Sequence, residues 1–211
     1  GDFFVLNEDI VMIGISERTS LEAIELIVPY IFEQSFQKVI AVDLPKERAM
    51  MHLDTIFTQT SYNEGILFNH ENYNIENLDI YMACKNSKSN KMSKHKFKFI
   101  DILKDFNFNL ISCGGNKNNF KLREQLTDGA NSFTLEPGKV IMYNCNHQTI
   151  KELEKNDYRH ISSKALYYDQ LTFEKILRSD SKVVISIDGS ELVKGRGGPR
   201  CMTLPINRGL I

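Results

Sequence analysis

The first 44 residues carry the pattern that most restricts the fold of this chain. Two apolar runs within residues 2–15 flank a short polar turn, which predicts a β-hairpin. Residues 21–34 follow with apolar side chains at a period close to 3.6, and Ser20 is placed to cap a helix there. A further apolar run, 39–44, ends at a proline. The order strand, strand, helix, strand predicts a ββαβ unit with its loops at one end of the strands.

The rest of the chain repeats this alternation more loosely. Lys, Ser and Asn dominate residues 85–98, which we interpret as a solvent-exposed loop. No linker divides the chain, so we expect one continuous α/β architecture. Residues 78–82 form a short apolar stretch and residues 99–104 an amphipathic one. Strands are expected at 109–113, 133–135, 140–143 and 183–187, and helices at 149–155 and 173–178.

Composition excludes several classes of protein. The 211 residues carry 26 Lys+Arg and 27 Asp+Glu, a formal net charge of -1, which argues against a nucleic-acid-binding chain. No run approaches the roughly 18 apolar residues of a membrane span. The four cysteines form no CxxC pair, so we expect no disulfide framework, no metal site and a reducing, cytoplasmic location.

The start of the chain is also informative. It begins Gly1–Asp2–Phe3 and enters a predicted strand at once, with no initiator methionine and none of the features of a signal peptide. We therefore expect the sequence to be a fragment of a longer protein.

Residues 51–55, Met-His-Leu-Asp-Thr, form the first cluster with chemical potential. On a strand, His52 and Asp54 would share one face. An imidazole beside a carboxylate can move a proton next to a bound cation. An isolated His-x-Asp pair is more often an ordinary surface or core histidine with a nearby acid.

The second cluster is the glycine-rich stretch 195–202, which contains Cys201. Its glycines permit unusual backbone angles and close approach of a ligand. Arg196 and Arg200 would favour a thiolate, the reactive form of a cysteine nucleophile. An ordinary glycine-rich turn that ends in a small buried cysteine is an equal alternative.

The third cluster, residues 16–20, lies at a predicted strand-to-helix turn. Arg18 could hold a carboxylate through a bidentate pair of hydrogen bonds. Such a segment is more often a helix cap with a solvated arginine.

The three clusters occur in a fixed order with three shorter motifs. The segments, in order, are Gly1–Asp2, Ser16–Thr19, Met51–Thr55, Asp128–Asn131, Pro137–Gly138 and Gly195–Met202. On these segments the chain resembles the carboxyl-terminal half of the arginine deiminases, over essentially all 211 residues. This resemblance implies a pentein fold, a five-bladed α/β propeller of ββαβ modules. Residues 1–211 would be the carboxyl-terminal part of a single catalytic domain.

The resemblance also implies a reaction: hydrolysis of L-arginine to L-citrulline and ammonia, without metal or organic cofactor. Cys201 would attack the guanidinium carbon and form a covalent thiouronium intermediate. His52 would donate a proton to the departing ammonia and then activate water. Asp54 would pair with the guanidinium nitrogens, while the substrate-binding set would comprise Arg18, Arg196 and Gly195.

The sequence departs from the family pattern at its beginning. Gly1–Asp2 matches the end of an EGGD motif whose glutamate would precede the chain, and an FTRD aspartate would lie further upstream. We therefore expect residues 1–211 alone to be inactive. Another guanidine-modifying pentein, or a degenerate or split half-enzyme, remains an alternative. The expected partner is L-arginine, with a homo-oligomer or a separate amino-terminal half as further candidates and no nucleic acid or membrane.

Overall fold

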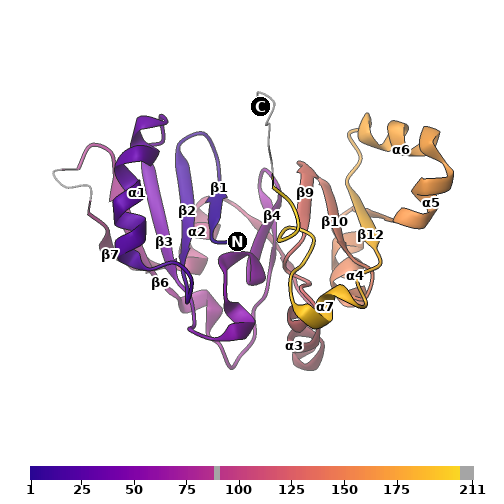
Figure 1. Cartoon of the computed structure of the whole chain (residues 1–211), viewed down its shortest axis with the longest axis horizontal. Helices are drawn as coiled ribbons and strands as arrows, with labels where there is room; N and C mark the ends of the chain where they lie inside the picture. Colours follow the sequence, from indigo (N-terminus) through magenta and orange to yellow (C-terminus); the bar gives the residue numbers. More distant parts are fainter. Residues whose placement is uncertain (88–90, 205–211) are drawn as a thin grey trace.

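In the computed structural model, which describes residues 1–87 and 91–204, the strands fall into three sheets flanked by helices (Figure 1). The strands are β1 (Phe3–Val5), β2 (Ile10–Ile15), β3 (Lys38–Asp43), β4 (Phe57–Ser61), β5 (Glu64–Leu67), β6 (Asp79–Cys84), β7 (Ser93–Lys98), β8 (Asn109–Ser112), β9 (Phe133–Glu136), β10 (Lys139–Tyr143), β11 (Arg159–Ser162) and β12 (Val183–Ile187). The α-helices are α1 (Leu21–Glu33), α2 (Phe99–Asp105), α3 (Asn118–Leu126), α4 (His147–Lys155), α5 (Ser163–Tyr168), α6 (Gln170–Leu177) and α7 (Leu192–Gly195). Short 3-10 helices occupy Arg48–Met50, Leu53–Thr55 and Ile75–Asn77. The mixed α/β class is as predicted.

The amino-terminal module confirms the predicted ββαβ unit. Strand β1 pairs antiparallel with β2, and β2 pairs parallel with β3. Helix α1 makes the crossover between the parallel strands. The Ser20 hydroxyl accepts a hydrogen bond from the Ala23 backbone N–H at 3.2 Å, which is the predicted N-cap.

The first sheet has the strand order β1-β2-β3-β6-β7 and is buried on both faces in its middle. All six residues of β2 are buried, as expected of a strand covered on both sides. Ile24 and Val28 of α1 pack on one face, in a cluster with Val11. Met12 and Ile40 point to the other face and join the main core of the molecule.

The other two sheets repeat the same combination of a hairpin with a parallel neighbour. In the sheet β4-β5-β8, β4 and β5 are antiparallel and β8 is parallel to β5. In the sheet β11-β12-β10-β9, the hairpin β9–β10 has β12 parallel to β10. The Thr134 hydroxyl bonds the Gln59 carbonyl at 2.7 Å and links these two sheets. Among the described residues the sheets form no closed ring, so the five-bladed propeller stays a prediction.

The prediction of a loop over residues 85–98 is wrong for its carboxyl-terminal part. Ser93–Lys98 form strand β7, which pairs antiparallel with β6. Lys94 and Lys98 both form ion pairs with Asp79 of β6, and this cross-strand pairing compensates their charge. A lysine-rich sequence is thus compatible with an edge strand. Residues 88–90 of this stretch lie outside the described residues.

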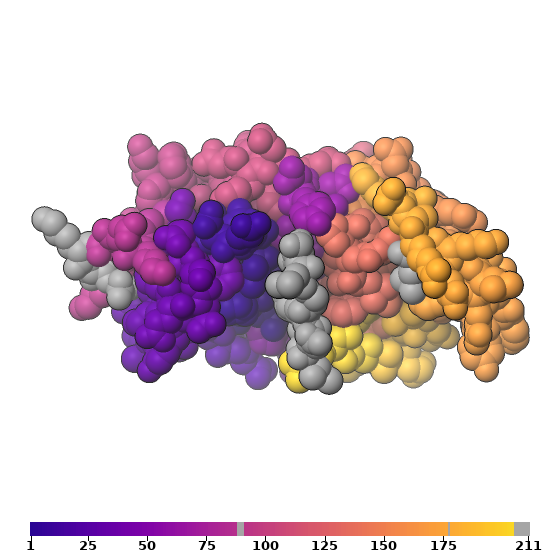
Figure 2. Space-filling model, turned by 90° about the horizontal axis from the view of Figure 1, so that it is seen from above, coloured from indigo at the N-terminus to yellow at the C-terminus, as the bar shows by residue number. Residues whose placement is uncertain are grey.

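The three sheets follow one another along the long axis of the molecule (Figure 1). Seen from above, the amino-terminal residues (indigo) and the residues of α5 and α6 (orange) lie toward opposite ends (Figure 2). The segment that follows α7 runs beside β9 toward the amino terminus, at the middle of the molecule (Figure 1). Within the described part of the chain, no helix is long and apolar enough to cross a membrane.

Candidate active site

Segments far apart in the sequence meet around the sulfur of Cys201. The Asp54 Oδ2 atom lies 3.9 Å from Sγ, and the Asn131 side-chain amide donates a hydrogen bond to Sγ at 3.2 Å. The neighbouring Arg200 guanidinium donates to the Gly1 carbonyl oxygen at 3.3 Å. The structure therefore brings the predicted nucleophile and the predicted guanidinium-binding carboxylate into one site.

A buried carboxylate, Asp2, organises two of these segments. Its Oδ1 atom accepts the Leu53 backbone N–H at 2.8 Å. Its Oδ2 atom accepts the hydroxyls of Ser16 and Thr19, each at 2.7 Å. Asp2 thus holds both the turn that carries Arg18 and the turn that carries Asp54, a role that sequence reasoning did not assign.

The structure corrects the expected strand around His52. Leu53–Thr55 form a 3-10 helix, and His52 precedes it in an extended conformation. The Leu53 and Asp54 backbone N–H groups bond the Asp2 carboxylate and the Gly1 carbonyl, not a neighbouring strand. The side chains consequently differ in environment: Asp54 is buried, while His52 is only half-buried.

Asp54 is a buried carboxylate of the site whose pKa is raised. Burial raises its pKa, and the opposite charges of Arg200 and His52 partly counter this effect. Arg200 Nη1 donates to Asp54 Oδ2 at 3.0 Å. The Oδ1 atom is buried and has no hydrogen-bond partner among the described residues. One oxygen of Asp54 is therefore available to a further donor.

The Arg200 guanidinium lies in a small cradle. Besides Asp54, it donates to the carbonyl oxygens of Gly1 and Phe3, and it stacks 3.8 Å above the centre of the Phe4 ring. A carboxylate, carbonyl oxygens and an aromatic face are the groups that bind a planar cation. The site can thus accommodate a guanidinium, supplied here by the chain itself.

The pKa of the Cys201 thiol is raised, not lowered as the neighbouring arginines led us to expect. Cys201 is an exposed residue, but partial desolvation of its sulfur and the nearby Asp54 carboxylate both raise the thiol pKa. The charge of Arg200 is compensated by Asp54, and that of Arg196 by Asp128, whose Oδ1 atom lies 3.5 Å away. Each arginine therefore has an acidic partner that cancels its effect on the sulfur.

The three predicted substrate-binding residues lie in different surroundings. Arg196 has a positive φ of 64° and donates to the Ala49 carbonyl at 3.1 Å. The Arg18 side chain is exposed beside the Ser16–Thr19 turn. Gly195 faces open space, since an added Cβ would meet no atom within 4 Å. Arg196 also forms an ion pair with Asp128, whose carboxylate accepts the backbone N–H of Gly197 in the Cys201 loop.

In the sequence, Asn131 belongs to the Asp128–Asn131 motif and has no predicted role of its own. Its side chain is fully buried, and both ends of the amide contact Cys201. Arg200 was considered only as a charge near the thiol. Asn131 and Cys201 lie 70 residues apart, so no local sequence pattern indicates that they are in contact. The order of the motifs along the chain is the one sequence signal that points to them.

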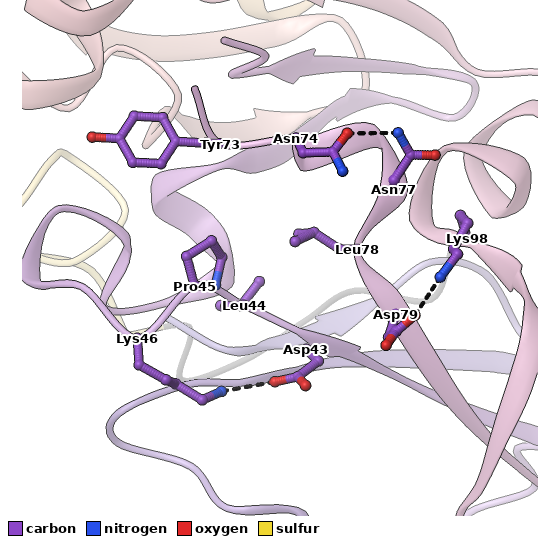
Figure 3. A pocket seen from close by; sticks show the side chains of 10 residues that line it. All are labelled: Asp43, Leu44, Pro45, Lys46, Tyr73, Asn74, Asn77, Leu78, Asp79 and Lys98. Atoms are coloured by element: carbon purple, nitrogen blue, oxygen red, sulfur yellow. Dashed lines mark hydrogen bonds and ion pairs between the residues drawn. The ribbon is translucent and has the colours of Figure 1, made fainter. Parts of the chain in front are cut away.

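A cavity of about 480 Å³ opens elsewhere, near the end of β3 (Figure 3). Its two lysines are engaged in ion pairs, Lys46 with Asp43 and Lys98 with Asp79. Neither Cys201 nor its neighbours line this cavity. In the part of the chain that the structure describes, no cluster of three His, Cys, Asp or Glu side chains could hold a metal ion.

The fold and the site together define a mixed α/β protein with a polar site centred on a cysteine. The sequence model of the family "Arginine deiminase" matches residues 1–208, and the chain belongs to that family. It is 37% identical over 215 residues to the arginine deiminase of Borrelia garinii subsp. bavariensis and 38% identical over 214 residues to that of Mycoplasma capricolum. Each alignment covers 99% of this chain and 46% of the relative, so the chain spans about half the length of these curated relatives.

A solved structure shares the fold. The apo crystal structure of an arginine dihydrolase from the ornithine–ammonia cycle in cyanobacteria superimposes with a TM-score of 0.52. The superposition covers 100% of this chain and 24% of that chain, at 15% sequence identity.

Proposed function

We propose that this chain carries the nucleophile of an arginine deiminase, which hydrolyses L-arginine to L-citrulline and ammonia. The observation that carries the proposal is the position of the Asp54 carboxylate. It lies 3.9 Å from the Cys201 sulfur and already binds a guanidinium, that of Arg200, at 3.0 Å. A substrate guanidinium held by the same carboxylate would present its central carbon to the thiolate.

The proposed reaction has two halves. The Cys201 thiolate forms a bond to the guanidinium carbon, and a C–N bond breaks as ammonia leaves with a proton from His52. The product of this half is a thiouronium covalently bound to sulfur. His52 then takes a proton from water, whose oxygen adds to the same carbon. The C–S bond then breaks while the remaining hydroxyl proton leaves to solvent, which releases citrulline and restores the thiolate. With this proton, the ammonia leaves overall as ammonium.

The remaining proposed roles concern the substrate carboxylate. Arg18 and Arg196 would hold it, and the open space at Gly195 would admit the substrate backbone. Arg18 is exposed, so its guanidinium can reorient toward a ligand. Arg196 has a buried Nε atom without a hydrogen-bond partner among the described residues, so it retains a donor for this task.

We also propose that residues 1–211 form the carboxyl-terminal part of one five-bladed catalytic domain. The repeated hairpin-plus-parallel-strand sheets and the 46% coverage of the relatives support this arrangement. We expect the 211-residue polypeptide by itself to be inactive, since it spans only 46% of the length of its relatives. The homo-oligomer, the separate amino-terminal half and the cytoplasmic location stay predictions.

The test is citrulline formation by the protein expressed from its whole open reading frame, supplied separately with L-arginine and with agmatine. We expect turnover of arginine and none in the Cys201→Ala variant, because that change removes the nucleophile and little volume. Cys84→Ala, a distant free cysteine, is the matched control and should retain activity. Turnover of agmatine but not arginine would favour a different guanidine-modifying enzyme, and full activity of Cys201→Ala would overturn the mechanism.

A further inference from the structure

The side chain of Asn131 is completely buried, and it bonds one residue at both ends of its amide. Its Nδ2 atom donates to the Cys201 sulfur at 3.2 Å, and its Oδ1 atom accepts the Cys201 backbone N–H at 3.3 Å. A buried amide requires hydrogen-bond partners, and here Cys201 supplies both a donor and an acceptor. The two contacts fix the position of the residue and of its sulfur together.

The surrounding contacts hold this amide in place. The Asn131 backbone N–H donates to the Asp128 carbonyl at 3.0 Å. The Asp128 carboxylate accepts the Gly197 N–H at 3.1 Å, which ties the same turn to the cysteine loop a second time. At Gly198 the loop approaches so closely that an added Cβ would lie 2.4 Å from Asn131 Oδ1. The turn 128–131 and the loop 197–201 therefore form one interlocked unit.

Because negative charges surround the Cys201 thiol, a neutral hydrogen-bond donor has a strong influence on whether the thiol ionises. Partial desolvation of the sulfur and the Asp54 and Asp128 carboxylates all disfavour a thiolate. A hydrogen bond from an amide N–H is stronger to a thiolate than to a thiol, so it favours ionisation without adding a charge. The titratable or charged side chains that face or adjoin the thiol are Asp54, Asp128, Tyr143, Arg200 and Arg196, the last of these paired with Asp128.

We propose that Asn131 is a positioning residue for Cys201, which orients its sulfur and stabilises its thiolate through the Nδ2–H···Sγ hydrogen bond. Its catalytic significance rests on the function proposed above. The hydrogen bond itself is a property of the folded chain and is testable without arginine turnover.

The first test is the rate at which iodoacetamide alkylates Cys201 as a function of pH, read by peptide mass spectrometry. Asn131→Leu removes the donor, keeps the number and branching of the side-chain heavy atoms, and does not change the charge. We expect the apparent pKa of Cys201 to rise by roughly one unit, which slows alkylation near neutral pH roughly tenfold. The same substitution at the exposed Asn144 is the control, with an expected change below roughly twofold. A folded Asn131→Leu variant with an unchanged pH profile would overturn the proposal.

A second measurement needs no substitution at Asn131. The side-chain NH₂ signals of Asn131 in a ¹⁵N NMR spectrum should shift with pH at the apparent pKa of Cys201, and Cys201→Ala should abolish that shift. Signals that stay constant while Cys201 ionises would equally refute the hydrogen bond. Neither the alkylation rate nor the NMR shift requires arginine turnover. If the protein does not hydrolyse arginine, both measurements still test the hydrogen bond, so the two proposals can be refuted independently.

Discussion

The Arg200 guanidinium donates a hydrogen bond at 3.0 Å to Asp54, whose side chain is only 1% exposed. This pair compensates the charge of a carboxylate that burial would otherwise strongly disfavour. It also means that a substrate guanidinium must share Asp54 through its unpartnered Oδ1 atom or displace Arg200.

Removal of Arg200 should destabilise the fold in a pH-dependent manner. Arg200→Ala leaves a buried carboxylate unpaired, and we expect the free energy of unfolding at pH 7 to fall by about 2 kcal/mol. The pKa of Asp54 is already raised in the folded state, so stability is lost as the pH rises through the window above its ordinary value of 3.8. Urea unfolding at pH 4 and pH 7 should therefore show the smaller loss at pH 4.

The control for this change is Lys46→Ala, which removes the exposed ion pair with Asp43. Its effect should stay within about 0.5 kcal/mol at either pH. An equal loss at both pH values in Arg200→Ala would contradict the assigned role of the ion pair.

Neutralising Asp54 should make Cys201 more acidic. The Asp54 carboxylate raises the pKa of the thiol from 3.9 Å away, so Asp54→Asn should lower the apparent pKa by roughly one unit. Alkylation of Cys201 below that pKa should accelerate accordingly, while arginine turnover should fall. Asp43→Asn, at an exposed ion pair, serves as the control. Slower alkylation in Asp54→Asn would argue against this electrostatic coupling.

Replacement by alanine should have very different effects at two glycines of the stretch 195–202. A Cβ at Gly198 would lie 2.4 Å from Asn131 Oδ1 and 2.6 Å from the Asn131 carbonyl oxygen, so Gly198→Ala must displace the loop. We expect a loss of about 1–3 kcal/mol in the free energy of unfolding. Gly195→Ala meets nothing within 4 Å and should be neutral. Equal effects of the two substitutions on urea unfolding would show that the loop does not pack on Asn131.

Ionisation of Tyr143 should make the free energy of unfolding fall at alkaline pH. Its hydroxyl donates to the Gly197 carbonyl at 2.8 Å, and burial raises its pKa to about 12. Because the folded pKa exceeds the ordinary value of about 10, this stabilisation is present below pH 10 and lost as the pH approaches 12. The stability difference between the unsubstituted protein and Tyr143→Phe should shrink over that range. A difference that is constant with pH would contradict the burial of the phenol.

The sequence predicted those elements that local patterns specify. The hairpin, the Ser20-capped helix and β3 each follow from apolar periodicity and turn residues within one short segment. Strand β7 departs from the prediction because two of its lysines, Lys94 and Lys98, pair with Asp79 of the neighbouring strand, a contact that local sequence does not show. The same holds for the site, where motif order indicated Cys201 and Asp54 but the Asn131 and Arg200 contacts depend on tertiary packing.

The central claim is that the Cys201 sulfur forms a bond to the guanidinium carbon of arginine. The most direct measurement is acid quenching of the whole-reading-frame protein during turnover of L-arginine, followed by peptide mass spectrometry. We predict that the peptide containing Cys201 gains the mass of arginine less ammonia, and that this adduct is absent in Cys201→Ala. Turnover to citrulline with an unmodified Cys201, or with the adduct on another residue, would contradict the account.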